Sequence, residues 1–224
     1  VQEWTDGAPL QVAAHKVRSP ERMQQVLRDL LTAIAHVHSK NVIHRDIKPG
    51  NIIIRKADQQ PCLIDFGAVK ELMSTVVSPA GLPQSSIVIG TAGYMPQEQA
   101  AGRPTFSSDL YSLSMTAICI LIGKHPAAIP TDSRTGRLLW QQYLPNINPA
   151  LADILTKAIH PYPQHRYHSA AEMLAALTHQ ATSTTNPNFT SPNFASAPPT
   201  AGVTVSPPGM LTASAIQAPT PHPI

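Results

Sequence analysis

Two short segments of this sequence hold several groups that could do chemistry, all within 22 residues. The segments are His-Arg-Asp-Ile-Lys-Pro-Gly-Asn (44–51) and Leu-Ile-Asp-Phe-Gly (63–67). Asp46 could accept the proton of a hydroxyl group, and Lys48, two residues on, could contact a phosphate. Asn51 and Asp65 offer one neutral and one charged oxygen ligand, and Mg²⁺ prefers hard oxygen ligands of this kind. Together these groups could support metal-assisted phosphoryl transfer.

Each of these features, taken alone, also has an ordinary structural explanation. An Asp-Phe-Gly sequence is often the end of a strand followed by a turn, and a His-Arg-Asp sequence can belong to a solvated loop. Asn51 could cap a turn, because asparagine side chains bond their own backbone there. The chemical interpretation is favoured because both segments occur in this order, next to apolar strand-like stretches.

The two segments resemble the catalytic loop and the metal-binding Asp-Phe-Gly turn of protein kinases. Residues 90–95 and Glu98 resemble the end of a kinase activation segment, and residues 108–113 resemble the start of the buried central helix of the family. Arg166 falls where the family keeps an arginine that pairs with this glutamate. The matches continue to about Thr178, and their style is similar to that of bacterial, cyanobacterial-like serine/threonine protein kinases.

The resemblance implies a role for each matching residue. Asp46 would serve the acceptor hydroxyl, Lys48 the transferring phosphate, and Asn51 with Asp65 would hold Mg²⁺, or alternatively Mn²⁺. ATP would be the phosphoryl donor and would lie against the hinge. The residues expected to bind ATP are Glu3, Thr5, Ile53 and Asp65. Other matching residues are expected to have structural roles: Gly67 would permit a sharp turn, and Asp109 would hold the catalytic-loop backbone. The residues with expected structural roles are His44, Phe66, Gly67, Glu98, Asp109 and Arg166.

Arg45 and Thr91 are expected to act on regulation and on substrate choice. In the family, an arginine directly before the catalytic aspartate clamps a phosphorylated residue of the activation segment. The candidate phosphorylation sites are Ser74, Thr75, Ser78, Ser85 and Ser86. Thr91 would contact the residue after the acceptor. Together with Lys48 it favours protein serine and threonine acceptors over tyrosine or small molecules. The alternative from a different class is a pseudokinase or scaffold lobe without catalysis.

The sequence also departs from the family pattern. The usual Ala-Pro-Glu reads Pro96-Gln97-Glu98, and a position that is usually glycine is Ser114, whose hydroxyl would need a partner in tight packing. The matched part contains no glycine-rich phosphate loop and no strand lysine. We therefore expect residues 1–180 to be the hinge and carboxy-terminal lobe of a kinase domain, incomplete at its amino terminus and inactive alone.

The pattern of apolar residues predicts a mainly α structure with a small β-hairpin, a kinase-like lobe of the α+β class. An apolar residue every three or four positions predicts an amphipathic helix over 21–39. Two apolar runs joined by residues 55–61 predict the hairpin, with Asn51 and Asp65 together at its open end. Further helices are expected in three places: a buried core helix at 110–123, a helix opened by Asn148-Pro149, and a last helix opened by the capping box Ser169–Glu172.

The remaining composition excludes several classes of protein. The net charge is only +3 without a dense basic run, so nucleic-acid or membrane binding is not indicated. Cys62 and Cys119 are predicted to be reduced core residues of a cytoplasmic protein. Three histidines lie close together in the sequence: His160, His165 and His168. Because prolines stand between them and no cysteine joins them, a solvated loop is favoured over a zinc site. The partners expected are protein substrates, and the oligomeric state is not predicted.

Residues 181–224 contain nine prolines and no charged residue. Such a composition cannot bury enough apolar surface to fold alone, so a disordered tail or linker is predicted. Its hydroxyl groups could be autophosphorylation sites, or the segment could be a passive tether.

Overall fold

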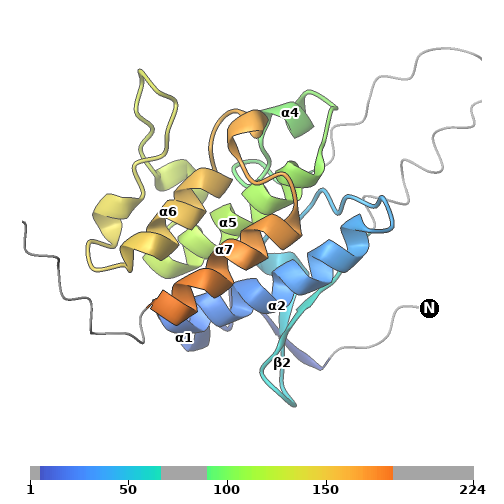
Figure 1. The fold of residues 1–224 in the computed structure, drawn as a ribbon. Coiled ribbons are helices and arrows are strands. Elements are labelled where there is room, and N and C mark those ends of the chain that lie inside the picture. The colour runs from blue at the N-terminus through green and yellow to red at the C-terminus, as the bar shows by residue number, and fades with distance from the viewer. Residues whose placement is uncertain (1–5, 67–89, 184–224) are drawn as a thin grey trace, which may run out of the picture. The chain divides into compact units, whose positions relative to one another are not determined.

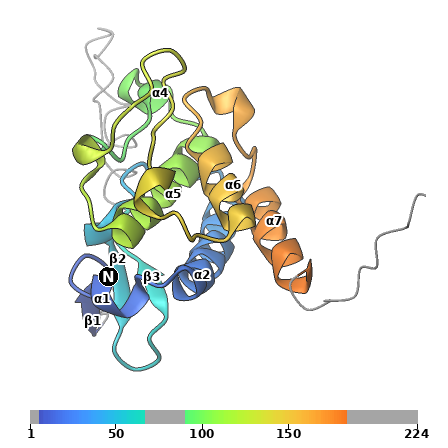
Figure 2. The same cartoon turned by 90° about the vertical axis from the view of Figure 1, so that its left-hand side faces the viewer.

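A long amphipathic helix, α2 (Pro20–His38), forms one side of the structure. The computed structural model describes residues 6–66 and 90–183 (Figures 1 and 2). Ser19 caps α2, because its side chain accepts a hydrogen bond from the Arg22 backbone nitrogen at 3.2 Å. The amphipathic helix predicted over 21–39 is confirmed. The apolar side chains that α2 buries are Met23, Val26, Leu27, Leu30, Leu31 and Ile34.

The central helix is α5 (Phe106–Ile122), which is buried along nearly its whole length. It starts in a capping box between Thr105 and Ser108 and ends at Gly123, whose φ of 68° suits glycine. Helices α2, α6 (Pro149–Ala158) and α7 (Ala170–Ser183) pack around it (Figure 1). The expectation of a buried helix in this region is confirmed.

Both predicted helix starts near the end of the lobe are present. The Asn148 side chain caps α6 by accepting from Ala150 and Leu151, with Pro149 in the first turn. Before α7, the Ser169 hydroxyl accepts from the Glu172 backbone nitrogen at 3.1 Å. The Glu172 carboxylate reaches back one residue further than in a standard capping box, to the backbone nitrogen of His168 at 2.8 Å. Helix α7 continues to residue 183, beyond the predicted limit of the lobe at residue 180.

A small antiparallel sheet has the strand order β1-β2-β3, formed by Gly7–Pro9, Ile52–Arg55 and Pro61–Leu63. The β2–β3 hairpin is the predicted one, with Ile52 opposite Leu63. Strand β1 was not predicted, since its glycine and proline are poor strand formers. The strand forms because its backbone approaches that of β2 closely at Gly7: a Cβ added there would lie 2.4 Å from the carbonyl oxygen of Ile54. The described part of the chain is therefore mainly α, with three strands there rather than the two of the predicted hairpin.

Short turns of helix connect these elements. They are α1 (Ala14–Val17), η1 (Pro49–Asn51), α4 (Gln97–Ala100), η2 (Pro126–Ala128), η3 (Gln141–Tyr143) and η4 (Pro163–His165). Within the described part of the chain, no helix is long and apolar enough to cross a membrane.

Two expectations about buried side chains need correction. Both cysteines are free, but only Cys119 is buried; Cys62 is half-buried at the end strand β3 of the sheet. The hydroxyl of Ser114 was expected to have a partner, yet it is buried on α5 without a hydrogen bond to any described residue. Such a group costs about 1–3 kcal/mol. Surrounding apolar packing has to offset that cost.

Candidate active site

The loop between α2 and η1 is fixed by a carboxylate from the central helix. Asp109 is almost fully buried, and its two oxygens accept hydrogen bonds from the backbone nitrogens of His44 and Arg45, each at 2.9 Å. One of these oxygens also lies 2.9 Å from Nε2 of His38. Arg45 has a φ of 71°, a left-handed conformation that costs energy for a residue with a side chain. The Asp109 contacts hold this conformation and thereby the position of Asp46.

His44 ties this loop to the segment after β3. Its Nε2 donates to the backbone oxygen of Ile64 at 3.0 Å, and its ring centroid lies 4.6 Å from that of Phe66. Burial lowers the pKa of His44, and the nearby Asp109 only partly counteracts this. The ring is therefore a neutral, structural link that brings Asp65 next to the catalytic loop.

Asp46 lies at the centre of a cluster of polar side chains. Its Oδ1 accepts from the Thr91 hydroxyl at 2.8 Å, and its Oδ2 accepts from Asn51 Nδ2 at 2.9 Å. Lys48 Nζ lies 2.8 Å from Oδ2 and also donates to the Thr91 hydroxyl at 2.8 Å. Residues from the loop, from η1 and from the segment before α4 thus converge on one carboxylate.

Asn51 and Asp65 stand at the open end of the β2–β3 hairpin. The Ile64 backbone nitrogen donates to the backbone oxygen of Asn51 at 2.9 Å, so Asp65 follows directly beside η1. The Asn51 side-chain nitrogen also bonds the backbone oxygen of Asp46 at 2.8 Å. Because that nitrogen is committed to Asp46, the amide oxygen is the atom left to bind a metal ion.

This donor set fits a metal ion that takes only some of its ligands from the protein and the others from phosphate and water. Within the described part of the chain, no group of three or more His, Cys, Asp or Glu side chains could form an all-protein metal cage. One amide and one carboxylate oxygen suit Mg²⁺, which usually keeps several waters and binds substrate phosphates.

A second buried ion pair joins the end of the activation segment to the rest of the lobe. Arg166 is fully buried and donates to both carboxylate oxygens of Glu98, at 2.7 and 3.2 Å. Ser108 on α5 donates to the same carboxylate at 2.7 Å. Burial alone would raise the pKa of Glu98, but the hydrogen bonds from Arg166 and Ser108 outweigh it and hold this pKa below its ordinary value. Glu98 is thus ionised and fixes α4 against α5.

Replacing Glu98 with alanine is expected to destabilise the lobe by about 3–5 kcal/mol, because the buried Arg166 would lose its counter-charge. The depressed pKa adds a pH dependence: the contribution of Glu98 is present above its unfolded pKa near 4.5 and is lost as the pH falls through the lower folded value. Urea unfolding of the chain at pH 7 and pH 4 measures both effects. Asp58→Ala, which removes an exposed ion pair with Arg55, is the control and should change the stability little. Equal losses of unfolding free energy in the two variants at pH 7 would contradict the role of Glu98 as the counter-charge of Arg166.

The remaining predicted residues divide between described and undescribed parts of the chain. Ile53 is buried on β2, where it pairs with Pro9 of β1 on one side and with Cys62 of β3 on the other. The Nε atom of Arg45 is buried and has no hydrogen bond to a described residue. Other predicted positions lie outside the described residues: Glu3, Thr5, Gly67, the five candidate phosphorylation sites and the tail after residue 183.

Two residues of the site were missed by sequence reasoning. The Gln99 side chain donates to the backbone oxygen of Arg45 at 2.5 Å, which ties α4 to the catalytic loop. His38 supports Asp109 from the end of α2. His38 could have been found, because it follows Ile34 by four residues and so shares the buried face of the helix. Nothing in the sequence around Gln99 signals its role.

Comparison with protein families agrees with this geometry. A family model described as a protein kinase domain matches residues 1–181. This chain belongs to the protein kinase family. The resemblance inferred from the catalytic loop and the Asp-Phe-Gly turn is therefore confirmed, together with the kinase-like fold.

The chain is similar to several bacterial kinases. It is 51% identical over 179 residues to serine/threonine-protein kinase PknA of Nostoc, covering 79% of this chain and 32% of that protein. It is 48% identical over 179 residues to serine/threonine-protein kinase C of Synechocystis, covering 79% and 34%. The crystal structure of the Mycobacterium tuberculosis PknI kinase domain matches with a TM-score of 0.58 at 22% identity, covering 80% of this chain and 64% of that one. The chain thus spans about a third of the length of the two curated relatives.

Proposed function

We propose that this chain is the acceptor-side lobe of a serine/threonine protein kinase, which transfers the γ-phosphoryl group of ATP to serine and threonine hydroxyls of proteins. The observation that carries the proposal is the cluster in which Asp46, Lys48, Asn51 and Thr91 bond one another at 2.8–2.9 Å. The relatives named as serine/threonine-protein kinases support the same choice of acceptor.

The hydrogen bonds of Asp46 indicate which of its oxygens accepts the proton. Oδ2 is engaged by Asn51 and Lys48, whereas Oδ1 accepts one bond, from Thr91. Each carboxylate oxygen can accept two hydrogen bonds, so Oδ1 retains a place for the acceptor hydroxyl. The proton of that hydroxyl passes to Oδ1 as its oxygen attacks the γ-phosphorus of ATP, and the bond from this phosphorus to the bridging oxygen breaks, so that ADP leaves. Lys48 stabilises the negative charge on the transferring phosphate.

Asn51 and Asp65 would hold Mg²⁺, with Mn²⁺ as a substitute, through one amide and one carboxylate oxygen. When bound, the ion neutralises charge on the phosphates of ATP. Ile53, on the strand beside these ligands, would lie below the adenine, and Glu3 and Thr5 would bind ATP at the hinge. Because ATP is a cytoplasmic donor and both cysteines are free, we expect the enzyme in the cytoplasm.

Arg45 is proposed to receive a phosphate from the activation segment. Its Nε is buried with no hydrogen bond to a described residue, so a guanidinium edge remains for an anion. A phosphorylated residue carries nearly two negative charges and would bind such an edge with two hydrogen bonds. The candidate sites between Asp65 and Glu98 stay predictions.

Phosphoamino-acid analysis tests the proposed acceptor class. The full-length gene product containing this chain is incubated with Mg²⁺, radiolabelled ATP and a generic protein substrate, and the labelled protein is hydrolysed. We expect label on phosphoserine and phosphothreonine. Label confined to phosphotyrosine, or no transfer by correctly folded protein, would overturn the proposal.

A further inference from the structure

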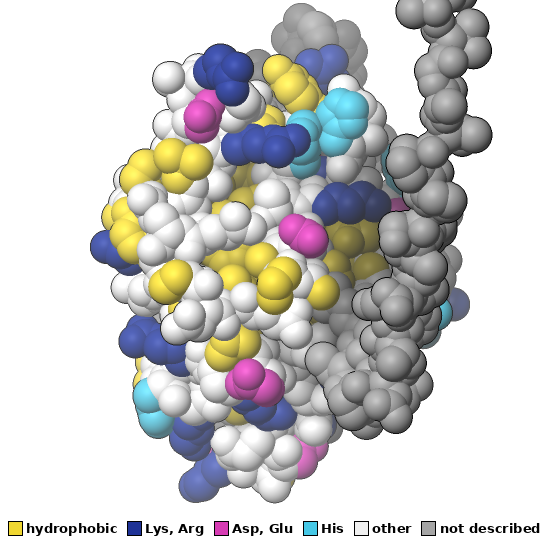
Figure 3. All heavy atoms as spheres, turned by 60° about the vertical axis from the view of Figure 1, so that its left-hand side comes forward, with side chains coloured by type: hydrophobic (Ala, Val, Ile, Leu, Met, Phe, Trp, Pro, Cys, Tyr) yellow, Lys and Arg dark blue, Asp and Glu magenta, His cyan; other side chains and the backbone are white. Residues whose placement is uncertain are grey.

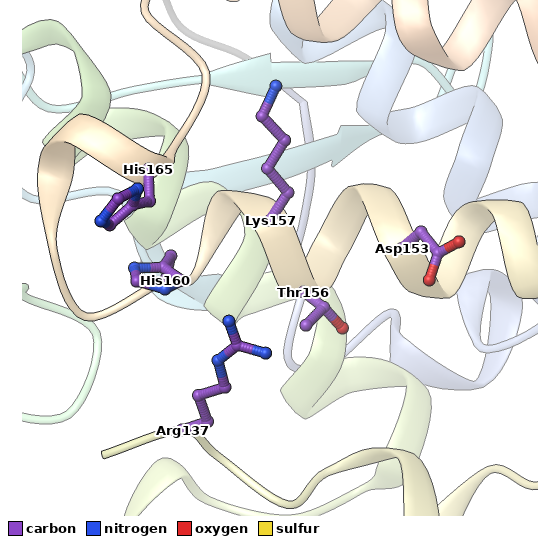
Figure 4. A pocket seen from close by; sticks show the side chains of 6 residues that line it. All are labelled: Arg137, Asp153, Thr156, Lys157, His160 and His165. Carbon is purple, nitrogen blue, oxygen red and sulfur yellow. The ribbon is translucent and has the colours of Figure 1, made fainter. Parts of the chain in front are cut away.

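A surface hollow of about 440 Å³ lies away from the catalytic cluster. Figure 4 shows it between the end of α6, the turn η4 and the loop before η3. Figure 3 shows histidine side chains next to Lys or Arg side chains in the upper part of the molecule. The hollow is lined by Arg137, Asp153, Thr156, Lys157, His160 and His165.

Arg137 supplies a positive charge at one end of the hollow. It is exposed, and its guanidinium makes no hydrogen bond or ion pair with any residue in the described ranges. In Figure 4 it points into the space between His160 and Thr156. A rigid turn presents it: Asp132 Oδ1 accepts from the backbone nitrogens of Arg134 and Thr135 at 3.0 and 2.7 Å.

The two histidines, His160 and His165, stand next to Arg137 at the same end of the hollow. Their ring centroids are 4.7 Å apart, and Nδ1 of His160 accepts from the backbone nitrogen of Tyr162 at 3.2 Å. The proton of the neutral ring therefore lies on Nε2, which leaves an N–H donor for a ligand. Burial lowers the pKa of His160 most, and the nearby His165 and Arg137 lower it further.

The other side chains of the hollow set its polarity and its rim. Lys157 Nζ forms an ion pair with Glu172 Oε1 at 3.2 Å and lies 4.0 Å from the centroid of the Tyr167 ring. Asp153 lies at the opposite end from the two histidines, where it would repel an anion from that end (Figure 4). Tyr162 is 58% exposed and stacks edge-on beside His165, giving the positive end an aromatic rim.

From this arrangement we propose that the hollow binds the phosphate group of a phosphorylated serine or threonine side chain in a protein segment. Guanidinium and imidazole donors suit the three oxygens of a phosphate monoester, and the exposed ring of Tyr162 provides apolar surface for neighbouring residues of the peptide. The volume exceeds that of a single phosphate, so flanking residues also fit. The inference rests on the proposed function, because phosphoserine and phosphothreonine are the products of such a kinase.

Fluorescence anisotropy tests the binding site without requiring transfer. The full-length gene product carrying Asp46→Asn, with no ATP present, is titrated against two labelled phosphoserine peptides: one copies residues 199–213 with phosphate on Ser206, and one has an unrelated sequence. We expect unphosphorylated versions to bind at least about tenfold more weakly. Binding of the tail peptide alone would identify this chain as the ligand, and binding of both would identify phosphorylated proteins in general.

Arg137→Ala is expected to weaken phosphopeptide binding about tenfold, because it removes charge-assisted hydrogen bonds. Arg134→Ala is the matched control: it lies in the same loop, is exposed, and removes the same charge outside the hollow. It should change the affinity less than about twofold. Equal effects of the two variants, with unchanged melting temperatures, or equal binding of phosphorylated and unphosphorylated peptides, would overturn the site. Absence of phosphoryl transfer by the unmodified enzyme would instead count against the proposed function alone.

Discussion

Replacing Asp46 with asparagine is expected to lower the kcat for protein phosphorylation about 10²–10⁴-fold in the full-length gene product. Asparagine keeps the size of the side chain and one acceptor oxygen, but it cannot take up the proton of the acceptor hydroxyl. The affinity for ATP should change far less, because Asp46 acts in the transfer step more than in ATP binding.

Steady-state kinetics with a protein substrate, together with ATP binding by calorimetry, separates these two effects. Asp58→Asn makes the same chemical change at an exposed carboxylate in the β2–β3 hairpin and should leave kcat unaltered. If the Asp46 variant retained near-wild-type kcat, Asp46 would not be the residue that serves the acceptor hydroxyl.

Replacing Asp109 with alanine is expected to destabilise the lobe by about 3–5 kcal/mol and to abolish activity. The carboxylate is buried, and its removal would leave the backbone nitrogens of His44 and Arg45, and the side chain of His38, without their acceptor. The left-handed conformation at Arg45 would then lose its support, so Asp46 would no longer be held.

Urea unfolding and kinase assays on the same preparations measure both parts of this prediction. Asp153→Ala removes an exposed carboxylate from the neighbouring helix α6 and should change neither quantity appreciably. A stable, active Asp109→Ala variant would mean that the loop is held by other contacts.

Regular periodic patterns allowed most of the fold to be predicted from the sequence. The stripe on α2, the apolar run of α5 and the cap of α6 by Asn148 each combine local preference with burial, so local sequence and tertiary structure favour the same element. Strand β1 was missed because Gly7 is there for close approach to Ile54, and a contact between residues 47 positions apart leaves no local pattern.

The candidate site was predictable only where a motif identified it. Asp46, Asn51 and Asp65 belong to short motifs, and the residue types in these motifs indicate phosphoryl-transfer chemistry. Gln99 bonds a backbone oxygen, a contact that many residue types could make, so its sequence context carries no signal. The hollow around Arg137 depends on a loop reaching two histidines more than 20 residues further along the chain, where the sequence alone favoured a solvated loop.

The most direct test of phosphoryl transfer at this centre is a single-turnover assay of the full-length gene product with Asp65 replaced by alanine. Asp65 would supply the charged oxygen ligand of the metal ion, so we expect transfer from radiolabelled ATP to fall about 10³-fold or more. The control Asp58→Ala, an exposed aspartate in the same hairpin, should transfer at the wild-type rate. Wild-type transfer by a folded Asp65→Ala variant would contradict the assignment of Asp46, Asn51 and Asp65 to one catalytic centre.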